Sequence, residues 1–462
     1  MSNPNKLKIT IVGAGSISFC PCILGDILLS DRLNEVPLEI CLMDISEDAL
    51  VLSSKYADAA IKASNRTPSI SSTTNLEKAL EGADYVITAI EVNRYHYWSM
   101  DFHIPRKYGF KQIYGENGGP GGMFHALRNM GPMLHIAKTM EKICPGAWLI
   151  NFTNPEAKLV EALSKLTKIK VVGLCHGIGM GLKQLSELLE VSREDLETTA
   201  CGLNHFGWFQ SIKNKKTGED LYPVLRKREQ QAQWLAQWDE IALSRFMLRT
   251  YGLWPYPGTN HIGEYISWRE ELLASSRFQY FFNPIEGEPW KTGKIPTFIY
   301  DLESDATSIP LFSEKNVKIA IPEYEERFMF ENNKLKPSGE VAIPIIEALA
   351  FDTAIEIDTV NMPNKGCIPG LPEDMVVELP AVVDGLGIHP KKMEPLPEAI
   401  TTMIRTQGAI HTLVIEAYAE QSRNKLLQAV LLDPTVSTYH NAVAMINEMC
   451  EFQKEILPPL YW

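Results

Sequence analysis

A glycine-containing turn directly after an apolar strand limits the folds open to this chain more than any other feature of its sequence. Lys8 to Val12 is a short β-forming run, and Gly13-Ala14-Gly15-Ser16 follows it at once. The two glycines allow a tight turn and let backbone N–H groups approach a pyrophosphate at the start of the next helix. Ser18 stands where the usual pattern has a third glycine. The turn alone is therefore weak evidence for a dinucleotide site.

A second strand ends on an acidic residue, which strengthens this interpretation. Leu38 to Met43 is β-forming, and Asp44 follows it, where an acid can accept hydrogen bonds from ribose hydroxyls. Asp44 lies 29 residues beyond Gly15 rather than the usual ~20, and the polar insert 30–35 accounts for the difference. The alternative is a turn and a strand-capping aspartate in another kind of α/β protein.

Strands and helices continue to alternate as far as residue 174. Helices are expected at 76–80 and 131–142, and buried strands at 83–90, 148–152 and 169–174. This alternation predicts an α/β fold with a Rossmann-type, doubly wound parallel sheet that binds its ligands at the carboxyl ends of the strands. Those ends carry Asn93-Arg94, Asn151 to Asn154 and Cys175-His176, so these polar residues should converge on one edge of the sheet.

A glycine-rich stretch, Tyr114 to Gly122, lies between two of these strands. It holds five glycines within eight residues. Glycine is unfavourable inside helices and strands, so the stretch predicts an irregular segment. A backbone that wraps closely around a ligand is the favoured interpretation, and a flexible linker is the alternative.

The length and charge of the chain bound its class. At 462 residues it exceeds one ordinary core, so we expect a nucleotide-binding domain over 1–200 and an α+β domain over 201–462. The net charge of −13 argues against nucleic acid or an anionic membrane as partner. No apolar run reaches 18 residues and the N-terminus lacks a signal-peptide core, so a cytoplasmic location is expected.

Three later segments carry predictions of their own. Asn361 to Gly366 predicts a loop that closes over the site. The runs 404–432 and 440–452 predict apolar helices that belong to the core or pack against another subunit, as in a homodimer or homotetramer.

A thiol and an imidazole stand side by side at the end of the strand 169–174, in Cys175-His176-Gly177-Ile178. A second imidazole, His205, follows 29 residues after His176. Such side chains suit a soft-to-borderline metal beside a cofactor. Taken one by one, a buried thiol and a hydrogen-bonded core histidine are the simpler interpretations, and the other seven cysteines fit free thiols in a reducing compartment.

Five ordered motifs now make the chain resemble glycoside hydrolase family 4, the NAD-dependent glycosidases that share a fold with lactate and malate dehydrogenases. The resemblance runs from about residue 7 to residue 440 and is most like the uronide-cleaving members. The motifs are Gly13-Ala14-Gly15-Ser16, Gly118-Gly119-Pro120-Gly121-Gly122, Asn151-Phe152-Thr153-Asn154-Pro155, Cys175-His176-Gly177-Ile178 and Gly202-Leu203-Asn204-His205, with Val376-Val377-Glu378-Leu379-Pro380 near the end.

The resemblance implies a role for each matching residue. Cys175 and His205 look like the protein ligands of a divalent metal, usually manganese. The residues expected to hold NAD are Gly13, Gly15, Ser16, Ile17, Asp44, Asn93 and Asn151. The residues expected to contact the sugar are Arg94, Glu116, Asn117 and Asn154. Many relatives have Asp-Thr in place of Glu116-Asn117, which leaves that contact open.

The resemblance also implies a mechanism without the usual pair of carboxylates. NAD takes hydride from C3 of the sugar, the metal assists removal of the C2 proton, the C1–O bond breaks by elimination, and water and hydride then return. His176 falls where the family places a proton donor to the leaving group. The segment 257–265 falls where the family places the base, with His261 nearest and Tyr265 second.

The residues after the metal cysteine follow substrate class in this family. Cys175-His176-Gly177 with Ile178-Gly179 looks most like the uronide-cleaving members. We therefore expect an α-galacturonidase, with α-glucuronidase or α-galactosidase as alternatives inside the family. A cation would have to hold the substrate carboxylate, and Arg94, Arg128 and Arg269 are the candidates. A simple NAD-dependent 2-hydroxy-acid dehydrogenase is the alternative from another class, but it gives no reason for a Cys175–His205 metal site.

Overall fold

The structure is a computed structural model, and it describes residues 4–16, 19–110, 112–231, 238–269, 295–296, 311–312, 330–331 and 334–462. Six parallel strands form one end of its main sheet, in the order β3-β2-β1-β4-β5-β6. These strands are β1 (Leu7–Val12), β2 (Leu38–Met43), β3 (Ser69–Thr73), β4 (Tyr85–Thr88), β5 (Trp148–Asn151) and β6 (Lys170–Gly173). This is the Rossmann strand order, so the predicted doubly wound sheet is confirmed.

Antiparallel strands continue the same sheet beyond β6, in the order β13-β14-β7-β8. They are β7 (Leu196–Leu203), β8 (Phe206–Asn214), β13 (Ile355–Pro363), β14 (Val376–Asp384) and β15 (Gly387–Pro390), which pairs with β14. The loop predicted at 361–366 is therefore wrong at its start, because Asn361 pairs with Gly173 of β6 and Glu378 of β14. Strand β7 crosses residue 200, and the division into two domains at that point stays a prediction.

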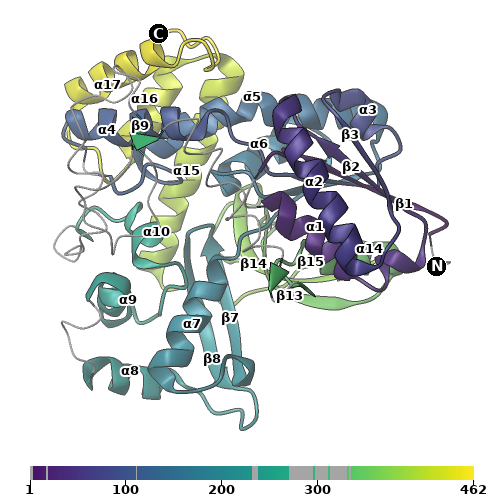
Figure 1. The fold of residues 1–462 in the computed structure, drawn as a ribbon. Coiled ribbons are helices and arrows are strands. Elements are labelled where there is room, and N and C mark those ends of the chain that lie inside the picture. The colour runs from purple at the N-terminus through teal and green to yellow at the C-terminus, as the bar shows by residue number, and fades with distance from the viewer. Residues whose placement is uncertain are drawn as a thin grey trace.

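Helices cover the sheet and extend from one end of it (Figure 1). The helices are α1 (Phe19–Leu29), α2 (Glu47–Ser64), α3 (Leu76–Leu80), α4 (Arg94–Lys107), α5 (Gly119–Ile143), α6 (Glu156–Leu166), α7 (Gly177–Leu189), α8 (Tyr222–Gln231), α9 (Trp238–Tyr251), α10 (Thr259–Gly263), α14 (Ala342–Phe351), α15 (Glu398–Glu420), α16 (Arg423–Leu432) and α17 (Tyr439–Phe452). Short 3₁₀ turns, η1 (Leu33–Glu35) and η2 (Arg193–Asp195), and short strands, β9 (Ile295–Pro296), β10 (Leu311–Phe312), β11 (Phe330–Glu331) and β12 (Lys334–Leu335), complete the elements.

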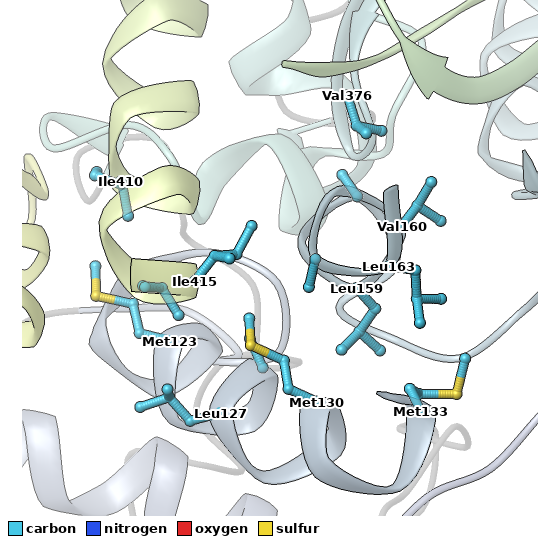
Figure 2. Close-up of a cluster of buried hydrophobic side chains, with 14 of the residues drawn as sticks. Met123, Leu127, Met130, Met133, Leu159, Val160, Leu163, Val376, Ile410 and Ile415 are labelled. Carbon is cyan, nitrogen blue, oxygen red and sulfur yellow. The ribbon is translucent and has the colours of Figure 1, made fainter. Parts of the chain in front are cut away.

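Around the parallel strands the core has two layers, because successive strand side chains point to opposite faces of the sheet. In β1, Ile11 belongs to the layer under α1 and α14, whereas Val12 belongs to the layer under α5 and α6. In the second layer, Met130 of α5, Leu159 of α6 and Ile415 of α15 face one another (Figure 2). In the described part of the chain, no helix is both long enough and apolar enough to span a membrane.

The glycine-rich stretch forms the start of a helix, which corrects the prediction that it is irregular throughout. Helix α5 begins at Gly119, with Gly118 as its N-cap and Pro120 in its first turn. The first N–H groups of a helix have no acceptor inside the helix, so proline costs little there. Gly119 has φ of +68°, a conformation that favours glycine. Consequently the loop proper is 114–118, and it leads directly into a 25-residue helix.

Candidate active site

The strand order reverses between β1 and β4, and the Gly13 turn lies at that crevice. Gly13 has φ of +87°. A Cβ atom added there would collide with the carbonyl oxygen of Ala89, which follows β4. Asp44 lies across the same turn, and its Oδ2 accepts a hydrogen bond from Gly15 N at 2.8 Å. The turn and the acid predicted from the sequence therefore lie together where a Rossmann sheet binds dinucleotides.

The other predicted cofactor residues have different local environments. Ser16 Oγ accepts a hydrogen bond at 3.1 Å from the backbone N–H of Phe19, the first residue of α1, and Ile17 lies outside the described residues. Asn93 is exposed at the start of α4, with φ of 42°. Asn151 is fully buried, and its Oδ1 accepts from Thr88 Oγ1 at 3.0 Å and from Thr153 N at 3.1 Å. Asn151 thus orders the turn after β5.

Cys175 and His205 come together from two parts of the sheet. Cys175 follows β6, and His205 lies in the two-residue turn between β7 and β8, since Leu203 pairs with Phe206. The φ of His205 is 60°, in the third position of the turn, where glycine or asparagine is usual. The Sγ atom of Cys175 lies 3.5 Å from Nε2 of His205. The predicted pair is therefore formed, on a turn whose backbone is strained.

The chemistry of this pair fits a divalent metal. Burial lowers the pKa of His205 well below its ordinary range, which favours the neutral imidazole that ligates metals. Burial raises the pKa of the Cys175 thiol, so a bound cation is what would favour its thiolate. Across the described ranges, no group of three or more His, Cys, Asp and Glu side chains could hold a metal. The candidate metal site therefore has two protein donors and leaves positions for substrate oxygens.

A buried glutamate, Glu378, lies beside the pair and was not predicted as a site residue. It is 1% exposed, and its Oε2 accepts a hydrogen bond from the hydroxyl of Tyr256 at 2.6 Å. Burial raises the pKa of Glu378 to about 7, although the hydrogen bond from Tyr256 opposes the rise. Its charge acts on the thiol of Cys175. Glu378 thus adds a buried carboxyl group to the surroundings of Cys175.

His176, the predicted proton donor, points toward a different partner. It is the N-cap of α7, and its Nδ1 lies 3.2 Å from Oε1 of Glu340, near the start of α14. The side chain is 69% exposed. Hydrogen bonding to Glu340 raises the pKa of His176, which favours its protonated form. A protonated, accessible imidazole can donate a proton, and this role stays a prediction.

Helix α10 and the residues just after it bring the two candidate bases, His261 and Tyr265, close to Cys175 and His205. The ring centroid of His261 lies 4.3 Å from that of His205. Burial lowers the pKa of His261, so its ring is neutral near pH 7 and able to accept a proton. Tyr265 is 4% exposed and its hydroxyl donates to the carbonyl oxygen of Asn204 at 3.4 Å. Of the two side chains, that of His261 is the more exposed, and the role of either as the base stays a prediction.

The predicted sugar contacts form a charged cluster beside the loop. Arg94 Nη2 donates to Oε1 of Glu116 at 2.7 Å, and its Nη1 lies 3.7 Å from Oε2 of Glu91. His125 joins both carboxylate residues, with Nε2 2.8 Å from Glu91 Oε2 and Nδ1 2.8 Å from the carbonyl oxygen of Glu116. These contacts lower the pKa of Glu91 to about 2 despite its burial. Arg94 and Glu116 are therefore oriented together.

The two asparagines of the predicted sugar site are held through their backbones. Glu264 and Lys158 bond the backbone N–H and carbonyl oxygen of Asn117. The amide of Asn129 donates to the carbonyl oxygen of Asn154 at 2.8 Å. Asn154 is half-buried and Asn117 is 3% exposed. Their contacts with a sugar stay predictions.

The structure thus unites Cys175, His205 and His261 on one side, and Arg94 with Glu116 on the other. It adds Glu378 and Glu264, two buried carboxyl residues that pattern reasoning missed. A charge inside an apolar strand, Val376-Val377-Glu378-Leu379, was the available signal for the first. Glu264 directly follows a short helix without apolar periodicity, so nothing in the sequence singled it out.

Comparison with known proteins identifies the family. Residues 8–191 match the family model described as family 4 glycosyl hydrolase, and residues 200–436 match that family's C-terminal domain. The predicted family is therefore confirmed over both parts of the chain.

Curated relatives resemble the chain along nearly its whole length. An α-glucosidase of Erwinia rhapontici is 31% identical and covers 92% of this chain and 93% of its own. An α-galactosidase of Bacillus subtilis is 31% identical over 96% of each chain. An α-galacturonidase of Thermoanaerobacter italicus is 29% identical over 98% of this chain and 97% of its own.

A solved structure has the same fold. The 6-phospho-α-glucosidase from gut microorganisms, in complex with NAD and Mn²⁺, gives a TM-score of 0.77 at 23% identity and covers 99% of this chain and all of its own. The family models, the relatives and the fold agree. This chain belongs to family 4 of the glycosyl hydrolases and is a glycosidase.

Proposed function

We propose that this glycosidase cleaves α-linked uronides, as an α-galacturonidase that uses NAD and a divalent metal such as Mn²⁺. The observation that carries the proposal is the 3.5 Å approach of Cys175 Sγ and His205 Nε2 at the carboxyl edge of a Rossmann sheet. When bound there, NAD supplies reversible oxidation at C3 of the sugar and the metal supplies Lewis-acid polarisation of the adjacent oxygens. The Gly13 turn and Asp44 would hold NAD, and Cys175 with His205 would hold the metal.

The chain's own residues then provide for proton movement. His261, neutral and 4.3 Å from the His205 ring, is placed to accept the C2 proton. His176, whose pKa is raised by its hydrogen bond to Glu340, would donate a proton to the leaving oxygen. Each would reverse its role in the second half of the cycle, so the enzyme ends each turnover in its starting state.

Arg94 is the strongest of the three candidate cations for the substrate carboxylate. Arg128 is 1% exposed and bonds Asp101 Oδ2 at 2.8 Å. Arg269 is also 1% exposed, and it donates to the carbonyl oxygen of Ile266. The side chain of Arg94 is 33% exposed beside the loop 114–118. Support for a uronide also comes from Cys175-His176-Gly177 and from the galacturonidase relative.

One observation favours a second candidate, an α-galactosidase. Glu116 and Glu91 both lie near Arg94, so a substrate carboxylate must compete with two protein carboxylates for one guanidinium. A neutral galactoside would meet no such competition, and the Bacillus subtilis relative carries that activity in its name. An α-glucuronidase shares the uronide requirement and differs only in a hydroxyl configuration.

A substrate panel with an arginine variant separates these candidates. We would compare 4-nitrophenyl α-galacturonide, α-glucuronide and α-galactoside, with NAD, Mn²⁺ and a thiol reductant. The galacturonide should have the highest kcat/KM, and Arg94→Met should lower it about 10- to 100-fold, the loss of a charge-assisted pair. Arg66→Met, at a matched 32% exposure beside Asp31, is the control. Higher kcat/KM for the galactoside, unaffected by Arg94→Met, would instead support the second candidate.

A further inference from the structure

Glu264 lies directly beneath the loop that carries the predicted sugar contacts. Its side chain is fully buried at the end of α10. Oε1 accepts a hydrogen bond from Glu116 N at 2.9 Å, and Oε2 accepts one from Asn117 N at 3.2 Å. One carboxyl group therefore holds two successive backbone N–H groups of the loop, just before helix α5 begins.

The loop is also held from other directions. The Nζ of Lys158, a buried residue of α6, donates to the carbonyl oxygen of Asn117. A Cβ atom added to Gly118 would lie 2.7 Å from Cβ of Glu264 and 2.9 Å from its carbonyl oxygen. The backbone of Gly118 thus rests against Glu264 without space for a side chain. These contacts fix the distance between the loop 114–118 and helix α10.

The same short helix carries His261 against His205, as described above. Only two residues lie between His261 and Glu264, so one turn of chain contacts both the metal pair and the sugar loop. On the loop, Glu116 in turn holds Arg94. We propose that Glu264 is a positioning residue that sets Glu116 and Asn117 relative to His261 through its two backbone hydrogen bonds. This role in substrate binding rests on the proposed function.

A carboxyl group is needed because both N–H groups require an acceptor. Burial raises the pKa of Glu264 to about 8, but each oxygen keeps a lone pair in either protonation state. A glutamine has the same length and only one acceptor oxygen. In Glu264→Gln, one loop N–H must therefore face an NH₂ group, and the loop is expected to move away from α10.

The kinetic test compares Glu264→Gln with a matched buried glutamate. Glu264→Gln should raise KM for 4-nitrophenyl α-galacturonide about 10- to 100-fold and should change kcat less. The Kd of NAD should stay within about twofold of the wild-type value. Glu229→Gln is the control, because Glu229 is 1% exposed and bonds Arg245 on α9. It should leave KM unchanged. An unchanged KM in Glu264→Gln, or an equal rise in the control, would overturn the proposal.

A double-mutant cycle tests whether Glu264 acts through the loop. Gly118→Ala pushes the loop off Glu264 and should raise KM to a similar degree. If both variants disturb the same contact, the double variant should be within about threefold of the worse single variant. Effects that multiply would show that Glu264 acts by another route.

A substrate-free measurement separates this proposal from the proposed function. Hydrogen–deuterium exchange should show protected amides at Glu116 and Asn117 in the wild type, and at least about tenfold faster exchange there in Glu264→Gln. Equal exchange in both proteins would refute the proposal that Glu264 holds the loop through these two backbone hydrogen bonds. If the amides of Glu116 and Asn117 exchange as predicted in both proteins but the wild type hydrolyses no uronide, only the substrate assignment would be refuted.

Discussion

Replacing His205 with asparagine should separate the stability of the fold from its function. His205 occupies a left-handed backbone conformation that costs a histidine about 1–2 kcal/mol and that asparagine adopts readily. Its Nδ1 is buried, with no hydrogen-bond partner in the described part of the chain, which costs a further ~1–3 kcal/mol. The folded protein therefore carries an unfavourable residue at this position.

The imidazole also contributes to stability, so the balance has to be worked out. The ring contact with His261 is worth about 0.5–1.5 kcal/mol, and the buried ring area about 1–2 kcal/mol more. These terms nearly offset the strain and the unpaired nitrogen. We therefore expect the free energy of unfolding of metal-free His205→Asn to lie between the wild-type value and about 2 kcal/mol above it. Activity should fall by more than ~100-fold, because one of two candidate protein metal donors is lost.

Urea unfolding of metal-free protein, repeated with added Mn²⁺, measures both parts. Mn²⁺ should stabilise the wild type and leave His205→Asn unchanged. Glu190→Asn is the control, because Glu190 has φ of 53° at the end of α7, away from the metal pair. The free energy of unfolding of Glu190→Asn should rise by up to about 1 kcal/mol, and its activity should stay at the wild-type level. A loss above 2 kcal/mol in metal-free His205→Asn, or retained turnover, would refute the reasoning.

Other predictions test the cofactor turn and the buried carboxyl group. Asp44→Ala should weaken NAD binding at least about tenfold in a fluorescence titration with NADH, because it removes both the ribose acceptor and the partner of Gly15; an unchanged Kd would argue against the site. Gly13→Ala should weaken NAD binding and lower the unfolding free energy by about 2–4 kcal/mol, through left-handed strain and overlap with Ala89. For Glu264, the folded-state pKa of about 8 lies above the unfolded value near 4.5, so its contribution to stability is complete below pH ~4.5 and lost as the pH rises toward 8. Between pH 5 and pH 8 the wild type should therefore lose more unfolding free energy than Glu264→Gln, by at most ~5 kcal/mol, and parallel curves would contradict this.

The parallel, doubly wound sheet and the convergence of polar residues on one of its edges were predicted from the sequence, whereas β3 was not. Apolar runs such as Leu38 to Met43 predicted buried strands, and the residues at their ends converge because parallel strands place their carboxyl ends at one edge. The sequence did not reveal that β13 and β14 extend the same sheet, since pairing between distant strands depends on tertiary packing. Asn361 was for this reason assigned to a loop.

The partners of the site residues were the part that pattern reasoning missed. Glu264 and Glu116 are 148 residues apart in sequence, and Tyr256 and Glu378 are 122 apart. Such contacts leave no local spacing to recognise. Helix α5 shows a related limit, because its glycines resemble a loop in composition but stand where a helix begins. Composition alone does not distinguish a loop from the first turn of a helix.

The most direct test of the account is hydrolysis of 4-nitrophenyl α-galacturonide in D₂O by protein stripped of metal and nucleotide. The account predicts that product forms only when both NAD and Mn²⁺ are returned, that NADH does not accumulate, and that the released galacturonate carries deuterium at C2. Turnover without NAD, or product that keeps its C2 proton, would contradict the central claim.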